Sequence, residues 1–299
     1  MKVTKLFHQE RLDKFIVANF NLARHQVDKL FANNQILLNG VVPFKKGINV
    51  KLNDEVSILK QQEKLQRQPT KKIKLPIVYE DKDVIVINKP KNILVHPTSF
   101  GDKNTIVQIL SRKIKKKEFA DQTRPGVVSR IDRNTTGLCI IAKNKYMFDS
   151  LLEQTKKRIM IKQYLAIVHH CFQDKFLLIK APIERSKQSR LKMVVSDEPK
   201  AKPATTEITV LENFRTASLI SCKLITGRTH QIRCHLAYIH HPVYNDPLYG
   251  TIDGFKDYDQ FLHCNYLKFY HPRLDKFIEL NCEPDKVFND LLIKLRSNL

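Results

Sequence analysis

Apolar residues in the first sixty positions change from a helical to a strand-like spacing. They first recur at i, i+3 and i+4, a period typical of amphipathic helices. Short apolar runs follow, and Asn39-Gly40 between two of them is a dipeptide typical of a two-residue hairpin turn. The pattern predicts a small α/β domain over residues 1–60, with helices at 11–20 and 23–31 and strands at 36–38, 41–42 and 56–59.

Strand-like segments dominate the larger block, residues 76–299. They do not alternate strictly with helices, which favours an α+β fold with a largely antiparallel sheet over a doubly wound one. The predicted strands cover 76–80, 83–88, 94–97, 137–142, 164–169, 208–211 and 217–224. The predicted helices cover 105–110, 147–155, 229–240 and 286–295.

Residues 61–75 lack apolar periodicity and are rich in Lys and Gln, so we interpret them as a basic linker between the two domains. The whole chain has 52 Lys and Arg against 30 Asp and Glu, a formal net charge of +22. This excess indicates a partner of dense negative charge, such as nucleic acid. A hydrophobic content of 42% excludes a disordered basic tail.

The apolar runs are all of strand length, far below the roughly 18 residues that a membrane-spanning helix needs. The first residues show no apolar signal segment. Six scattered cysteines form no Cys-x-x-Cys pair, which fits reduced thiols. We therefore expect a cytoplasmic protein without membrane contact, for which a monomer suffices.

Sequence motifs for cofactors are lacking. There is no glycine-rich phosphate loop, dinucleotide fingerprint, His-Glu-x-x-His pair or nucleophile elbow. His230 and His235 lie five residues apart, which separates them by about 140° around a helix and disfavours a shared metal ion. We expect neither a cofactor nor a metal.

Two segments combine charged residues with conformationally special ones. In the first, Asp132 lies between Arg130 and Arg133 in a polar loop that leads into a buried strand. In the second, Gly227 permits a sharp turn between a strand and a helix that Thr229 would cap. A surface loop or an ordinary strand–turn–helix corner would give the same patterns, so spacing alone leaves their role open.

Taken in order with other motifs, these segments resemble the RluA family of RNA pseudouridine synthases over about residues 77–270. The matching motifs are Asn88-Lys89-Pro90 with Val95-His96-Pro97, Arg130-Ile131-Asp132 with Thr135-Thr136-Gly137, Lys162-Gln163-Tyr164-Leu165-Ala166, residues 226–233, and Asp246-Pro247-Leu248-Tyr249-Gly250. The resemblance implies the pseudouridine synthase fold with a catalytic cleft. It also implies an isomerase that converts uridine to pseudouridine in structured RNA without a cofactor.

Three residues depart from the family pattern. Ser129 stands where the family commonly has His, and Asn92 and Asn245 stand where it commonly has Gly. Asn is the non-glycine residue that best tolerates a positive φ. We therefore expect left-handed backbone at Asn92 and Asn245.

Residues 1–60 resemble the RNA-binding domain first described in the fourth protein of the small ribosomal subunit. The matching residues are Arg11-Leu12-Asp13, Arg24, Ile36-Leu37-Leu38-Asn39-Gly40 and Asn53-Asp54-Glu55-Val56. Many family members that modify large-subunit ribosomal RNA carry such a domain, so the resemblance implies that RNA as the partner. It places RNA contacts at Arg11, Arg24 and Lys29.

The family resemblance assigns catalytic roles to three residues. Asp132 is the expected nucleophile, Arg228 its cationic partner, and Tyr164 the aromatic ring on the flipped base, with a phenol available to remove the C5 proton. Arg130 would fill the stack that the flipped base leaves. Whether Asp132 attacks the ribose, attacks the base or removes a ribose proton is open at this point. Further expected RNA contacts are Arg133, Lys162, Arg190 and Arg233.

Two other classes of function stay open as well. A non-catalytic RNA-binding or ribosome-assembly factor on the same scaffold would be indicated by loss of the acid or its arginine partner, and the sequence has both Asp132 and Arg228. A nucleoside or glycosidic hydrolase would need two carboxylates across the bond, whereas Asp132 is the only acid in its motif. Release of free uracil would identify the hydrolase.

Overall fold

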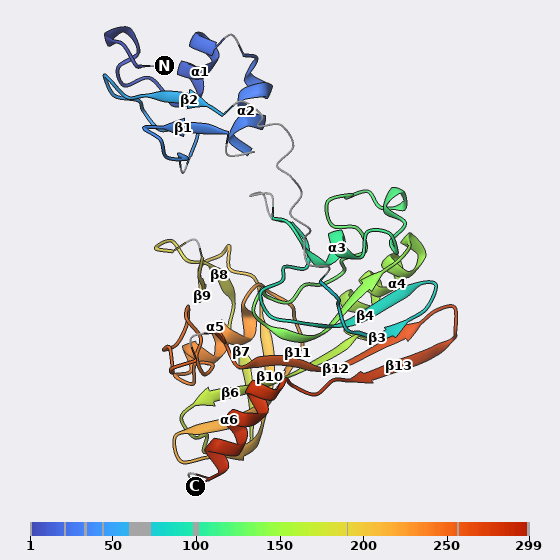
Figure 1. Cartoon of the computed structure of the whole chain (residues 1–299). Coiled ribbons are helices and arrows are strands. Elements are labelled where there is room, and N and C mark those ends of the chain that lie inside the picture. The colour runs from blue at the N-terminus through green and yellow to red at the C-terminus, as the bar shows by residue number, and fades with distance from the viewer. Residues whose placement is uncertain are drawn as a thin grey trace. The chain divides into compact units, whose positions relative to one another are not determined.

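The computed structural model describes residues 2–20, 22–32, 35–43, 45–59, 73–97, 102–189, 191–255 and 257–297. The chain divides into two compact units, residues 1–73 with 97–103 and residues 74–96 with 104–299 (Figure 1). Most of the predicted linker, residues 61–75, lies outside the described residues. Within the described chain, no helix is both long and apolar enough to cross a membrane.

The small unit packs two helices beside a two-stranded antiparallel sheet. Its elements are η1 (Lys5–Phe7), α1 (Leu12–Phe20), α2 (Arg24–Ala32), β1 (Ile36–Leu38) and β2 (Val56–Ile58). Leu12, Phe15 and Ile16 are buried at the predicted helical spacing and form part of its core. The predicted hairpin is wrong in one arm, because Val41 forms only an isolated bridge and β1 pairs with β2 instead.

The large unit is built on one mixed sheet. Over the described residues its strand order is β3-β4-β5-β12-β6-β11-β10-β7, with β13 beside β12, and only β5 and β12 run parallel. The strands of this sheet are β3 (Ile77–Glu80), β4 (Val84–Lys89), β5 (Thr136–Ala142), β6 (Ile161–His169), β7 (Phe176–Lys180), β10 (Thr205–Asn213), β11 (Ala217–Leu224), β12 (Leu262–His271) and β13 (Lys276–Asn281). Two further strands, β8 (Ile183–Arg185) and β9 (Met193–Val195), form a separate antiparallel pair. This confirms the predicted α+β class with a largely antiparallel sheet.

Helices cover the sheet with their apolar faces. They are α3 (Ile106–Ile109), η2 (Lys116–Glu118), α4 (Lys145–Lys156), α5 (Gln231–Tyr238) and α6 (Lys286–Ser297). α4 packs on β5 and β12, and α5 packs on β9 and β10. α6 buries Phe288, Leu291, Leu292 and Leu295, which recur at the spacing i, i+3, i+4, i+7 of an amphipathic helix.

The main error of the strand prediction is the omission of β12 and β13. β12 lies between β5 and β6, yet its sequence includes His263 and His271, both of which are buried. His263 accommodates burial because Nδ1 contacts Thr136 Oγ1 at 2.8 Å and Nε2 contacts the Cys282 carbonyl at 3.0 Å. Residues 94–97, predicted as a strand, form no strand, and Val95 and His96 lie in a bend.

Gly137 lies at the parallel contact between β5 and β12. Its φ is +102°, and a Cβ built there would be 2.3 Å from the carbonyl oxygen of Cys264. Only glycine permits this approach of two backbones. The loop that carries Asp132 leads directly into this contact, so the position of the loop depends on the close pairing of the two strands.

Candidate functional site

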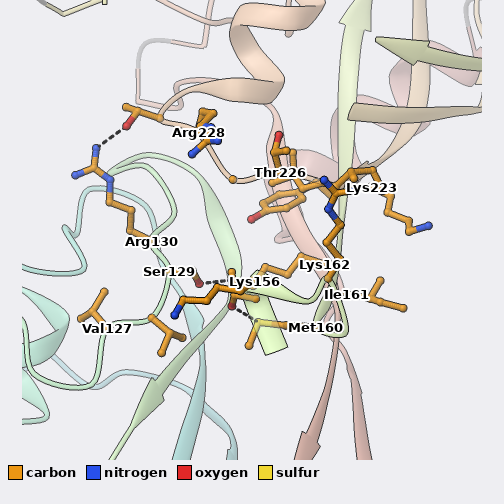
Figure 2. A pocket seen from close by; sticks show the side chains of 18 of the residues that line it. Val127, Ser129, Arg130, Lys156, Met160, Ile161, Lys162, Lys223, Thr226 and Arg228 are labelled. Atoms are coloured by element: carbon orange, nitrogen blue, oxygen red, sulfur yellow. Dashed lines mark hydrogen bonds between the residues drawn. The ribbon is translucent and has the colours of Figure 1, made fainter. Parts of the chain in front are cut away.

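A pocket of about 670 Å³ opens beside the Asp132 loop (Figure 2). Its walls come from residues 127–132, from the start of β6 and from the turn between β11 and α5. Asp132 is the only carboxylate among the described residues that line it. The cations that line it are Arg124, Arg130, Lys156, Arg158, Lys162, Lys223 and Arg228. The charge of the lining therefore suits a polyanion.

A buried lysine fastens the loop of Asp132. Lys89, at the end of β4, is fully buried, and its Nζ donates to the carbonyls of Pro90 (2.9 Å), Ile93 (2.9 Å) and Arg133 (2.7 Å). Burial lowers the pKa of Lys89 to about 8, partly opposed by the charge of Asp132. All three ammonium protons of the charged form are used, and one of them holds the carbonyl of Arg133, the residue after Asp132.

Asp132 is partly exposed, and an arginine on α5 holds its carboxylate. Arg233 Nη1 donates to Asp132 Oδ2 at 3.1 Å. The other edge of the Arg233 guanidinium forms a bidentate pair with Asp246, with Nε–Oδ2 at 2.7 Å and Nη2–Oδ1 at 2.8 Å. Asp246 is fully buried and also accepts the backbone N–H groups of Leu248 and Tyr249.

Arg233 is therefore a fixed cation between two acids. Burial by itself lowers the pKa of Arg233, but the hydrogen bonds and charges of Asp246 and Asp132 outweigh burial and raise it. The guanidinium stays charged, and its planar fork is oriented by Asp246 before any substrate binds. The cation next to Asp132 is thus held from its other side by a buried carboxylate.

The structure corrects two predictions about arginines. Arg228, predicted to pair with Asp132, is exposed and donates from Nε to the Pro203 carbonyl at 3.0 Å. Arg233, predicted to contact RNA, is the residue that pairs with Asp132, and its guanidinium is engaged by protein carboxylates. The helix begins only at Gln231, so Arg228 lies in the turn before it. Arg233 lies three residues before the buried Leu236 in α5, and this helical spacing would have indicated that Arg233 is also buried.

One buried amide organises the turn between β11 and α5. Gln231 Oε1 accepts from Thr226 Oγ1 at 2.8 Å and from the Arg228 N–H at 3.0 Å. Its Nε2 donates to the Thr205 carbonyl at 2.9 Å and to Thr206 Oγ1 at 3.0 Å. These bonds tie the turn to β10 and bring the first turn of α5, with Arg233, to Asp132.

The predicted cap of α5 is displaced by one residue. The N-cap is His230, with a left-handed φ of 54°, and not Thr229. Thr229 Oγ1 accepts instead from Arg130 Nη2 at 3.2 Å, which bridges the two motifs (Figure 2). His230 Nε2 lies 3.9 Å from Asp132 Oδ2, so the sequence prediction overlooked a second group that faces the acid.

Tyr164 and Asp132 line the same pocket, as the resemblance implies. Tyr164 lies on β6 and is buried. Burial, with Cys264 and Asp132 nearby, raises the pKa of its phenol well above the usual value. The ring therefore presents a neutral, protonated phenol.

Lys162 lies on β6 and is partly buried in the wall of the same pocket. Its Nζ donates to Ser129 Oγ (Figure 2). Burial lowers the pKa of Lys162. Ser129, at the position where the RluA family commonly has His, thus contributes a small acceptor for a lysine. This bond joins the start of the Asp132 loop to β6.

The other predicted RNA contacts are dispersed. Arg11 is paired with Asp13, with Nη2–Oδ2 at 2.9 Å, and Arg24 is exposed on α2. Arg133 is exposed beside Asp132. The side chain of Lys29 and the whole of Arg190 lie outside the described residues.

Outside the pocket, Asp81, Asp83 and His271 bring three possible metal-ligand atoms within 4.8 Å of one another. Protein groups already engage them: Arg273 donates to Asp83 at 2.7 Å, Asn144 donates to Asp83 at 2.8 Å, and His271 Nε2 lies 2.9 Å from Asp81 Oδ2. Arg273 supplies the positive charge that a cation would bring. This cluster therefore serves to join β4 to the end of β12.

The chain is similar to known proteins in both sequence and structure. The family model described as RNA pseudouridylate synthase matches residues 83–238. An RNA pseudouridine synthase of Mycoplasma pneumoniae is 37% identical over 96% of this chain and 93% of its own length. Ribosomal large subunit pseudouridine synthase D of Escherichia coli K12 is 34% identical over 88% of this chain and 83% of its own length. The solved structure of human RNA pseudouridylate synthase domain containing 1 is 25% identical, covers 77% of this chain and 98% of its own, and superposes with a TM-score of 0.58.

Proposed function

Because this chain belongs to the RNA pseudouridylate synthase family, we propose that it isomerises uridines of large-subunit ribosomal RNA with Asp132 as the nucleophile. The observation that carries the proposal is the carboxylate of Asp132, held by the buried Arg233 at 3.1 Å, in a pocket whose other charged lining residues are Lys and Arg.

The reaction requires no net change in composition. The N1–C1′ bond of uridine breaks, the base turns, and a C5–C1′ bond forms while C5 loses a proton and N1 gains one. Asp132 forms a temporary bond to the nucleoside with an oxygen lone pair and is released when the new carbon–carbon bond closes. Since substrate and product are isomers, the balance contains no oxidant or reductant.

The surroundings of Asp132 suit a nucleophile. Arg233 donates a hydrogen bond to it, and Asp246 holds Arg233 so that the guanidinium needs no rearrangement during the reaction. Tyr164 supplies the ring that packs on the flipped base. Its raised pKa argues against a phenolate that takes the C5 proton, and favours packing as its role.

RNA as substrate is supported by charge. A net charge of +22 and the row of Lys and Arg around the pocket suit a folded polyanion. A base inside folded RNA must be flipped out at a cost of a few kcal/mol, and Arg130, at the mouth of the pocket, is the residue we assign to the vacated stack. Relatives named for the large ribosomal subunit, together with the resemblance of residues 1–60 to a ribosomal RNA-binding domain, support that RNA and with it a cytoplasmic site of action.

Asp132→Asn tests the proposal because it removes the charge and keeps the shape. We expect pseudouridine formation in a large-subunit ribosomal RNA transcript to vanish while RNA affinity, measured by fluorescence anisotropy, persists. Asp149→Asn is the matched control, because Asp149 is exposed on α4 and paired with Lys145. Persistent modification by Asp132→Asn would show that another group is the nucleophile, and release of free uracil would identify a hydrolase.

A further inference from the structure

The two oxygens of Asp132 have unequal surroundings. Arg233 Nη1 at 3.1 Å and His230 Nε2 at 3.9 Å both face Oδ2. Among the described residues, no hydrogen bond or ion pair reaches Oδ1. The carboxylate therefore has one oxygen that faces protein groups and one that no described group holds.

The proton position of His230 follows from its neighbour Tyr249. The Met193 N–H donates to the Tyr249 hydroxyl oxygen at 2.7 Å, and that hydroxyl lies 3.0 Å from His230 Nδ1. A backbone N–H can only donate, so the hydroxyl proton is free to go to Nδ1. The opposite assignment would leave that proton without an acceptor among the described residues. His230 then carries its own proton on Nε2, the atom that faces Asp132.

Burial keeps His230 neutral near pH 7. Burial lowers its pKa below the ordinary 6.5, Arg233 and Arg130 lower it further, and Asp132 and Asp246 oppose them. Burial also raises the pKa of Tyr249, so its hydroxyl keeps the proton that it donates.

The backbone is adapted to this ring position. His230 takes a left-handed φ of 54°, which non-glycine residues seldom adopt, and its ring meets the Tyr249 ring edge-on at 5.7 Å. The guanidinium carbon of Arg233 lies 5.1 Å from the centroid of the same Tyr249 ring. Tyr249 thus contacts both groups that face Oδ2.

We propose that His230, oriented by Tyr249, is a positioning residue for Asp132: its Nε2–H faces Oδ2, holds negative charge there and leaves Oδ1 to react with the nucleoside. This role rests on the proposed function only in that Asp132 is the nucleophile. The tautomer itself is a property of the free protein. When His230 is protonated, Nδ1 can no longer accept from Tyr249, and a full positive charge faces Oδ2.

The first test observes the tautomer without catalysis. In the full chain labelled with ¹⁵N-histidine, NMR at neutral pH should show His230 with a bare Nδ1 and a protonated Nε2. Tyr249→Phe should produce a mixture of the two tautomers. A wild-type His230 protonated on Nδ1 would overturn the proposal, whatever the outcome for Asp132→Asn.

The second test is kinetic. The amide nitrogen of Gln reaches about as far as Nε2, whereas that of Asn reaches only about as far as Nδ1. His230→Gln should keep single-turnover pseudouridine formation within about threefold of wild type, and His230→Asn should lose about tenfold, with KM for RNA unchanged in both. In the wild type the rate should fall at acid pH as His230 protonates, below pH 6.5, and this fall should be missing in His230→Gln.

The matched control is His240→Gln, because His240 is an exposed histidine that also has a left-handed φ, 62°, and does not line the pocket. It should react like wild type. Melting temperatures of all variants separate loss of folding from loss of positioning. Equal rates for the Gln and Asn variants, or a change confined to KM, would overturn the proposal. An inactive wild type with the expected tautomer would instead reject the proposed function.

Discussion

Replacing Asp246 by Asn tests whether the second carboxylate orients the cation that faces Asp132. Asp246 has no exposed surface and accepts four hydrogen bonds, two of them from Arg233. Asn keeps one acceptor oxygen but places an NH₂ group opposite a donor. The substitution therefore exchanges an attractive contact for two donors facing each other in a buried site.

The expected loss of stability can be estimated from burial. Removing one partner of a buried ion pair costs about 3–5 kcal/mol. Arg233 keeps its contact with Asp132, so we expect the lower end, about 3 kcal/mol. In a domain of this size each kcal/mol lowers Tm by about 2–4 °C, so Asp246→Asn should melt about 6–12 °C below wild type.

Catalysis should suffer as well as stability. A guanidinium freed from Asp246 would move by about 1 Å, and a displacement of that size costs about 10²-fold in rate. Calorimetry and single-turnover pseudouridine formation measure the two effects. Asp290→Asn is the control, since Asp290 forms an exposed i,i+4 pair with Lys286 and such pairs contribute little. An Asp246→Asn enzyme with the melting temperature or the rate of the wild type would refute the idea that Asp246 orients Arg233.

Three further outcomes are expected. Gly137→Ala should cost at least about 3 kcal/mol in urea unfolding, because its Cβ would lie 2.3 Å from the Cys264 carbonyl oxygen, while Gly227→Ala, with open space around it, should change little. Between pH 8 and 10.5 the free energy of unfolding of wild type, relative to that of Lys89→Met, should rise by about 3 kcal/mol. In this range Lys89 of the unfolded chain still binds a proton, whereas the folded lysine, with a pKa of about 8, has lost it. A difference in urea unfolding that does not change with pH would contradict this. RNA affinity should fall steeply with salt, and Lys156→Gln, on the pocket rim, should reduce the slope of log affinity against log salt by about 1. A nearly flat salt dependence would exclude phosphate binding by these cations.

Local signals in the sequence were sufficient for much of the fold and for the placement of Asp132 in the pocket. Amphipathic spacing predicted α1 and α2 within a few residues, because an apolar stripe at helical period depends only on neighbours in the chain. The helices predicted at 147–155 and 286–295 likewise match α4 and α6 within a few residues. Left-handed backbone at Asn92 (φ 63°) and Asn245 (φ 55°) is confirmed, since the conformational tolerance of Asn is a property of the residue. The ordered motifs likewise predicted that Asp132, Tyr164 and Arg130 line one pocket.

Only the tertiary structure decided which arginine pairs with Asp132 and which strand lies between β5 and β6. Arg233 lies 101 residues from Asp132, and it was chosen over Arg228 by where α5 begins and by Asp246, which holds it from behind. β12 escaped prediction because its buried histidine His263 is satisfied by partners far along the chain. Helix periods and turn preferences are encoded by adjacent residues, whereas the choice between two arginines depends on burial and on acceptors that exist only after distant segments have packed.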